Sequence, residues 1–250
     1  MSDGTTLHPI DPELVRRYVA AVGGVLPAEA LVVATTDPVW SERLLAKAER
    51  GYERALRGEE VGANVVSVGL AQVLATAHPT FSLPGAGFSF WEARIDRGLG
   101  MLLRPPSRLF GEAGLATAAA RAMPIRVDAA GGAMGGAYVP ARLVPRLRAL
   151  LDERETRLVR RLVEAELDAV PLYGLLLEAV AYADERGLGL YEAIDAIVPE
   201  APEADPPGAR IVAPDRKRLD PALRKRLEDA AKPPKQPGLL TRLRKRGERG

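Results

Sequence analysis

The longest stretch of the sequence without a formal charge runs from Val61 to Trp91, and it limits the possible folds more than any other feature. Within it, residues 64–77 are apolar around the whole circumference of a helix, so this helix has no face suited to water. Polar residues and prolines break the stretch well short of the roughly 20 apolar residues that a membrane-spanning helix needs. We therefore expect a buried helix at the centre of a bundle, and no transmembrane segment.

Aspartate–proline pairs mark the starts of two helices. Asp11-Pro12 and Asp37-Pro38 each supply an N-cap acceptor followed by a proline, whose missing N–H costs nothing in a first turn. Apolar residues at helical spacing predict that these helices extend to residues 23 and 58. Further helices are predicted at 89–103, 107–111, 115–122, 145–168, 172–187 and 190–198. We expect one mainly α-helical, compact domain over residues 11–198, preceded by a flexible N-terminus of residues 1–10.

Residues 124–141 are the least helical part of this domain. Two short apolar segments, 125–127 and 137–139, flank four glycines: Gly131, Gly132, Gly135 and Gly136. Glycine adopts positive φ angles without a steric penalty, so such a cluster is typical of a turn between strands. The sequence predicts a small β-hairpin or an ordered glycine-rich loop here.

The composition changes near Pro199. Residues 199–250 contain nine of the 21 prolines and carry 14 basic against 8 acidic side chains, a net charge of +6, whereas residues 1–198 carry −4. Leu219-Asp220-Pro221 repeats the helix-start pattern and predicts a short helix at 221–231. We expect a flexible, proline-rich basic C-terminal tail over 199–250 that contains this helix.

Rare residue types exclude several kinds of chemistry. The chain has no cysteine, which removes thiolate nucleophiles, iron–sulfur clusters and cysteine-based zinc sites. It has two histidines, His8 and His78, too few for a histidine-rich metal centre. Lys47 is the single lysine before residue 199 and follows no glycine-rich turn, so a phosphate-binding P-loop and a Schiff-base lysine are also excluded. We expect no metal and no cofactor.

Two features of the helical domain suggest a small-molecule site, and each has an ordinary structural explanation. The backbone amides of Gly131, Gly132, Gly135 and Gly136 could bind an anion with Arg126 as the charge partner, or these glycines could simply form a turn. His78 could act as a general base toward a nearby hydroxyl, or it could cap the end of the preceding helix. The structural explanations are the more common ones.

The tail carries the strongest functional signal. Arg242, Arg244, Lys245 and Arg246 would attract anionic partners, and Leu239, Leu240 and Leu243 favour docking on a surface because a solvating tail has no use for them. The leading hypothesis is a non-enzymatic, cytoplasmic adaptor or assembly protein whose tail docks on an acidic protein; the location follows from the charges in the first thirty residues. Alternatives are nonspecific binding of nucleic acid, peripheral contact with an anionic membrane, and an enzyme or sensor using the Gly131–Gly136 loop.

Overall fold

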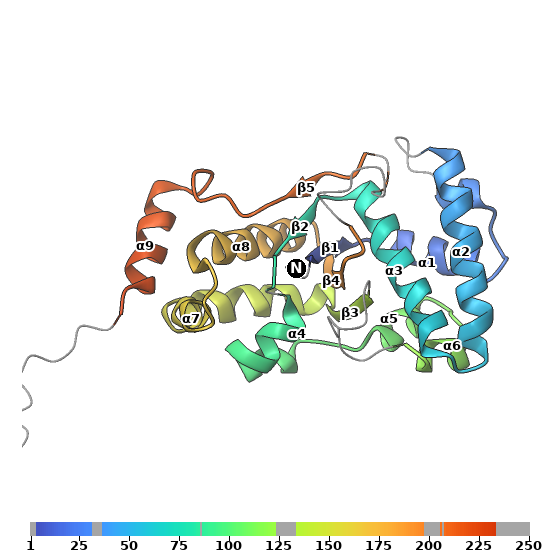
Figure 1. Cartoon of the computed structure of the whole chain (residues 1–250), viewed down its shortest axis with the longest axis horizontal. Helices are drawn as coiled ribbons and strands as arrows, with labels where there is room; N and C mark the ends of the chain where they lie inside the picture. Colours follow the sequence, from blue (N-terminus) through green and yellow to red (C-terminus); the bar gives the residue numbers. More distant parts are fainter. Residues whose placement is uncertain are drawn as a thin grey trace, which may run out of the picture.

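The computed structural model describes residues 4–31, 37–85, 87–123, 134–197, 206 and 208–233. A five-stranded sheet lies in the middle, in the order β3-β4-β1-β2-β5, from β1 (Thr5–Ile10), β2 (Thr80–Ser82), β3 (Met134–Val139), β4 (Gly189–Ile194) and β5 (Ile211–Val212). Strand β1 pairs antiparallel with β2 and β4, β3 pairs antiparallel with β4, and β5 is parallel to β2. The protein is mainly helical, as expected, around this small sheet (Figure 1).

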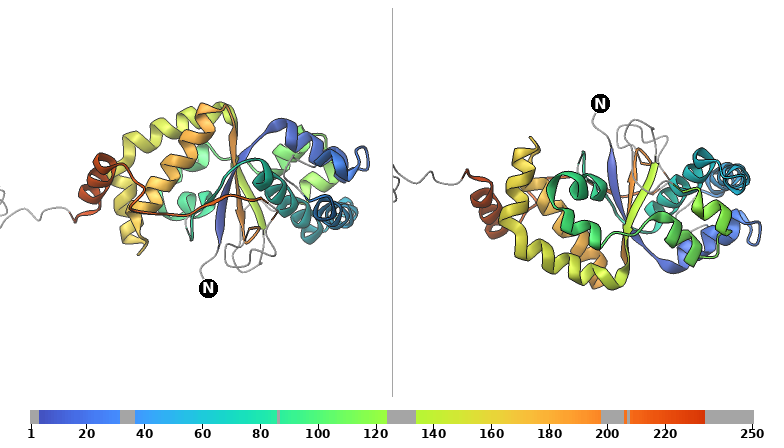
Figure 2. Two further views of the ribbon diagram at one scale, coloured as in Figure 1. Left: turned by 90° about the horizontal axis from the view of Figure 1, so that it is seen from above. Right: turned by 90° about the horizontal axis from the view of Figure 1, so that it is seen from below.

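Helices cover both faces of the sheet, so the fold has three layers (Figure 2). One layer contains α1 (Pro12–Val22), α2 (Pro38–Leu56), α3 (Glu60–Ala77), α5 (Pro106–Glu112) and α6 (Thr117–Arg121). The other contains α4 (Phe88–Phe90), a π-helical turn (Trp91–Ile95), a 3-10 turn (Arg97–Met101), α7 (Val144–Glu164), α8 (Ala169–Glu185) and α9 (Pro221–Ala231). Each layer has its own apolar core against the sheet. Short 3-10 turns at Ala28–Leu31 and Ala141–Leu143 complete the described elements.

The predicted helix starts are confirmed. The Asp11 carboxylate accepts hydrogen bonds from the backbone amides of Glu13 and Leu14, and the Asp37 carboxylate accepts one from Val39. Asp220 caps α9 in the same way. These side chains satisfy amide groups that a helix leaves unpaired in its first turn.

Helix α3 is the predicted apolar core helix. It packs closely on α2, because a Cβ atom on Gly62 would lie 2.6 Å from the carbonyl oxygen of Gly51. Among the described residues, α3 is the one helix long and apolar enough to span a membrane, but two thirds of it is buried inside the fold. A core helix of a globular domain meets the same criterion, so we assign α3 to the core.

The N-terminus is not the flexible segment that the sequence predicted. Residues Thr5–Ile10 form the central strand of the sheet, and all six are buried. Both faces of a central strand are covered, so its residues do not alternate between apolar and polar, and the segment shows no hydrophobic periodicity. Its buried polar residues Thr6 and His8 are satisfied by hydrogen bonds to each other, to Ala193 and to Thr80.

Residues 190–198 were predicted as a helix, but Gly189–Ile194 form β4. The alternation of Leu190, Tyr191 and Glu192 directs side chains to opposite faces, and both faces are covered by helices. The predicted hairpin is also different: β3 pairs with β4, fifty residues away, and residues 125–127 lie outside the described residues.

Part of the predicted flexible tail is instead packed on the folded body. Residues 208–232 cross the molecule from β5 to α9 and pack on the body, as Figure 1 shows. The predicted helix at 221–231 is confirmed as α9. Residues 234–250, with Leu239, Leu240, Leu243 and the basic cluster 242–246, lie outside the described residues.

Candidate functional site

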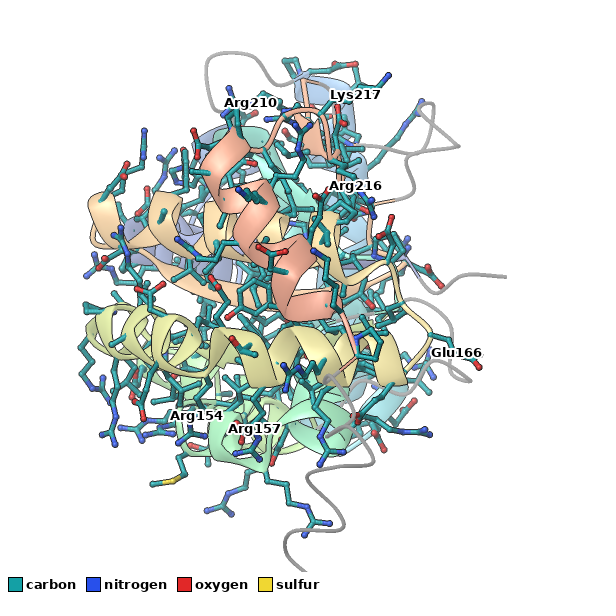
Figure 3. All side chains as sticks on the ribbon, turned by 90° about the vertical axis from the view of Figure 1, so that its left-hand side faces the viewer. Arg154, Arg157, Glu166, Arg210, Arg216 and Lys217 are labelled. Atoms are coloured by element: carbon teal, nitrogen blue, oxygen red, sulfur yellow. The ribbon has the colours of Figure 1, made fainter. Side chains whose placement is uncertain are left out.

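The segment from Ile211 to Ala231 packs along the surface of the rest of the fold, which we call the body. It begins as β5 at the edge of the sheet, runs along α8, and ends as α9 across α7 and α8. Figure 3 looks onto α9, with Arg216 and Lys217 near its start. We call this part of the chain the C-terminal strap.

Apolar anchors hold the strap. Leu219 packs directly on Gly174 of α8, where a Cβ atom would collide with the leucine side chain. Leu227 of α9 is fully buried in the core formed with α7 and α8, and Leu223 packs at its margin. Leu223 and Leu227 lie four residues apart on α9, which places them on one face of that helix, and Leu219 precedes it. Burying a leucine side chain stabilises a contact by about 1.5–3 kcal/mol.

Ion pairs between the basic strap and the acidic body add to these anchors. Arg216 pairs with Asp168 at 2.8 Å, Arg218 with Glu178 at 3.2 Å, and Arg226 with Glu155 at 2.8 Å. The first two pairs are exposed and contribute little to stability. Glu155 is only 11% exposed, and both of its carboxylate oxygens accept from Nε of Arg226 at 2.9 Å. This hydrogen bond raises the pKa of Arg226. The Arg226–Glu155 pair therefore fixes the position of α9.

Part of the basic charge on the strap stays available. Lys217, Arg224 and Lys225 make no ion pair within the described part of the chain. Lys225 lies at an open groove of about 500 Å³ between α7 and α9, which Glu155 and Asp229 also line. The strap thus uses some of its cations on the body and presents the others to solvent.

The glycine cluster is only partly described. Arg126, Gly131 and Gly132 lie outside the described residues, and Gly135 and Gly136 belong to β3. The amide of Gly135 donates to the Asn64 side-chain oxygen at 3.2 Å, and a Cβ atom on Gly135 would collide with the Tyr191 hydroxyl and with Ser67. Gly135 therefore permits close packing of β3 against α3.

His78 occupies the C-cap position of α3. Its Nδ1 lies 3.3 Å from the Tyr182 hydroxyl, its Nε2 is buried without a hydrogen-bond partner, and burial lowers its pKa. About 16 Å of helix separates His78 from Ser67, which contacts Gly135. The structure therefore does not bring His78 and Gly135 into one site.

Two buried titratable residues were missed by sequence reasoning. His8 lies between two threonine hydroxyls, with Nε2 2.8 Å from Thr6 Oγ1 and Nδ1 3.3 Å from Thr80 Oγ1. Thr6 donates to the carbonyl of Ala193, so it accepts from His8, and this assigns the neutral Nε2–H form. Burial lowers the pKa of His8 to about 3.

Glu192 is the second. Its side chain is 1% exposed and accepts from the Ser89 amide at 3.0 Å and from the Ser89 hydroxyl at 2.6 Å. Burial raises its pKa to about 7, although the two hydrogen bonds from Ser89 and one from the Ala137 backbone oppose this. Ser89 thus donates its hydrogen bonds to Glu192, and not to His78. In the sequence, Glu192 stands alone among apolar residues. Its burial could be recognised only once residues 189–194 were known to form the paired strand β4.

Among the described residues, no group of three or more histidine, aspartate or glutamate side chains is arranged to hold a metal ion. Comparison with models of known protein families, with curated proteins and with solved structures found no match for this chain.

Proposed function

We propose that this protein is an adaptor whose C-terminal residues 239–246 dock on an acidic helical surface of a partner protein in the cytoplasm. The observation that carries the proposal is the strap, in which leucines and arginines of the same C-terminal region bind an acidic helical surface of the protein itself. Leu227 supplies the buried apolar contact, and the Arg226–Glu155 pair supplies the charged one.

A sequence repeat extends this chemistry to the end of the chain. Residues 219–228 read LDPALRKRLE, and residues 239–248 read LLTRLRKRGE. The two segments share two leucines four residues apart, the triplet Arg-Lys-Arg and a glutamate, all at equivalent positions. The second segment therefore carries the residue types with which the first one binds α7 and α8.

The differences between the two copies indicate a partner other than the protein's own body. Gly247 stands where the first copy has Leu227, the fully buried anchor, so the second copy cannot reproduce that contact. The surface on α7 and α8 is also already occupied by the first copy. Residues 239–248 should therefore bind this surface more weakly than residues 219–228. They stay available to an acidic surface of another protein that has apolar pockets for two or three leucines.

A quantitative pulldown from nuclease-treated lysate tests the proposal, with the wild-type chain beside the triple variant Leu239→Ser, Leu240→Ser, Leu243→Ser. Each leucine contributes on the order of 1.5 kcal/mol, so the triple variant should bind at least about 100-fold more weakly. The matched control replaces the same leucines with methionine, which keeps the apolar contact, and should retain the partner. Capture that is unaffected by serine refutes the proposal.

The same proteins separate the alternatives. A protein tethered to nucleic acid binds a random RNA or DNA with an affinity that falls steeply with salt and does not depend on the leucines. Replacing Arg242, Arg244, Lys245 and Arg246 with glutamine should weaken both kinds of binding. If binding is lost in the glutamine variant but kept in the serine variant, the tail binds nucleic acid. The same result with anionic vesicles would assign the tail to a membrane surface.

A further inference from the structure

A pocket of about 220 Å³ lies on the opposite side of the sheet from the strap, at the edge where β1 and β3 end. These strands run in the same direction because both are antiparallel to β4. Helix α1 begins directly after β1, and α5 packs beside β3 (Figure 1). The pocket therefore lies between this end of the sheet and the helices α1 and α5.

The lining of the pocket is mostly apolar. It is formed by side chains from β1, α1, α5 and the segment after β3, chiefly Ile10, Val15, Leu109, Ala113 and Ala141. The pocket is open to solvent on one side and has room for roughly seven water molecules. Apolar walls with a few polar groups are typical of small-molecule sites.

The pocket has one hydroxyl group in its lining, on Tyr138. Most of the Tyr138 side chain is buried, and its hydroxyl makes no hydrogen bond within the described residues but is open to solvent. Burial raises the pKa of Tyr138, nearby Glu112 raises it further, and three arginines oppose this: Arg108, Arg142 and Arg104. The hydroxyl is therefore a neutral donor in a region with more positive than negative charge.

The charges at the mouth favour an anion. Glu112 lines the pocket, but Arg108 pairs with it at 2.8 Å, and Arg16 pairs with Glu13 at 2.7 Å. Arg142 is not part of the lining, but its charge lowers the pKa of Tyr138, and it makes no ion pair within the described part of the chain. We propose that this pocket binds a small apolar monocarboxylate, with its chain against Val15 and Leu109 and its carboxylate accepting from the Tyr138 hydroxyl near Arg142. The inference is independent of the strap and of the adaptor proposal.

Titration of the full-length protein with hexanoate, followed by ¹H–¹⁵N NMR, tests this site. Hexanoate should give saturable shifts of the amides of Val15, Ala113 and Ala141, with a dissociation constant of about 1 mM, typical of so small a ligand. The neutral 1-hexanol should bind at least about threefold more weakly, and hexylammonium should not bind. Absence of saturable shifts at about 20 mM hexanoate, or equal binding of hexylammonium, overturns the proposal.

Variants locate the binding. Ala113→Leu fills the pocket and should abolish the hexanoate shifts, whereas Ala118→Leu, an exposed change on α6, should not. Tyr138→Phe and Arg142→Gln should each weaken hexanoate by about threefold to tenfold without affecting 1-hexanol, and Arg146→Gln is the matched charge control. Circular dichroism confirms that each variant is folded. Unchanged hexanoate binding in a folded Ala113→Leu or in Tyr138→Phe overturns the assignment.

Discussion

Replacing Glu192 with glutamine should remove the part of the pH dependence of the free energy of unfolding that comes from this carboxyl group. The carboxyl group is buried between β4 and the start of α4, and its pKa is about 7 instead of 4.5. The folded protein therefore binds this proton more tightly than the unfolded chain. The resulting stabilisation is fully present below about pH 4.5 and is lost as the pH rises through about 7.

The magnitude follows from the two pKa values. The interval from 4.5 to about 7 corresponds to roughly 3 kcal/mol in the free energy of unfolding, of which about 2–3 kcal/mol falls between pH 5 and pH 8. Glutamine has no charge to bury, and its amide can donate to Ser89 Oγ while its oxygen accepts from the Ser89 amide. The variant should thus lack this loss and be more stable than wild type at about pH 8.

Urea unfolding of both proteins at about pH 5 and about pH 8 measures the effect. The change in free energy between the two pH values is compared between wild type and variant, so that contributions of His8 and of surface groups cancel. Glu92, the other carboxylate that raises the pKa of Glu192, is present in both proteins. Equal pH dependence in the two proteins would refute the reasoning.

Three further changes have defined outcomes. Leu227→Ala should lower the free energy of unfolding by about 2–5 kcal/mol, because it leaves a cavity beneath α9, and urea unfolding measures this; a loss below about 1 kcal/mol would show that the strap is not held by this anchor. Asp11→Ala should cost about 1 kcal/mol through loss of the α1 cap, seen as a fall in Tm of about 2–4 °C, and an unchanged Tm would contradict the capping role. His8→Asn should reduce the loss of stability between about pH 6.5 and pH 4, because the lowered pKa of His8 destabilises the folded protein as the pH falls below 6.5; the same acid sensitivity in the variant would exclude His8 as its source.

Most of the helices could be predicted because their signals are local. Asp11, Asp37 and Asp220 cap helices through backbone amides only two or three residues away. The apolar circumference of residues 64–77 likewise required a buried position wherever the helix lay. The docking role of Leu239, Leu240, Leu243 and the basic cluster 242–246 stays a prediction, because these residues lie outside the described part of the chain.

The sheet and both proposed sites depend on contacts between distant parts of the chain. Thr5–Ile10 form a strand because they pair with Phe81 and Ser82 on one side and with Gly189–Ile194 on the other. The pocket at Tyr138 also combines residues that are more than a hundred positions apart.

The sequence alone determined the starts of the capped helices, the excluded chemistries and the charge difference between body and tail, since each depends on neighbouring residues or on composition. Tertiary structure decided that Glu192 and His8 are buried, that β4 is a strand, and that the strap is bound. These outcomes follow from desolvation and long-range hydrogen bonding, which act only after the chain has brought remote segments together.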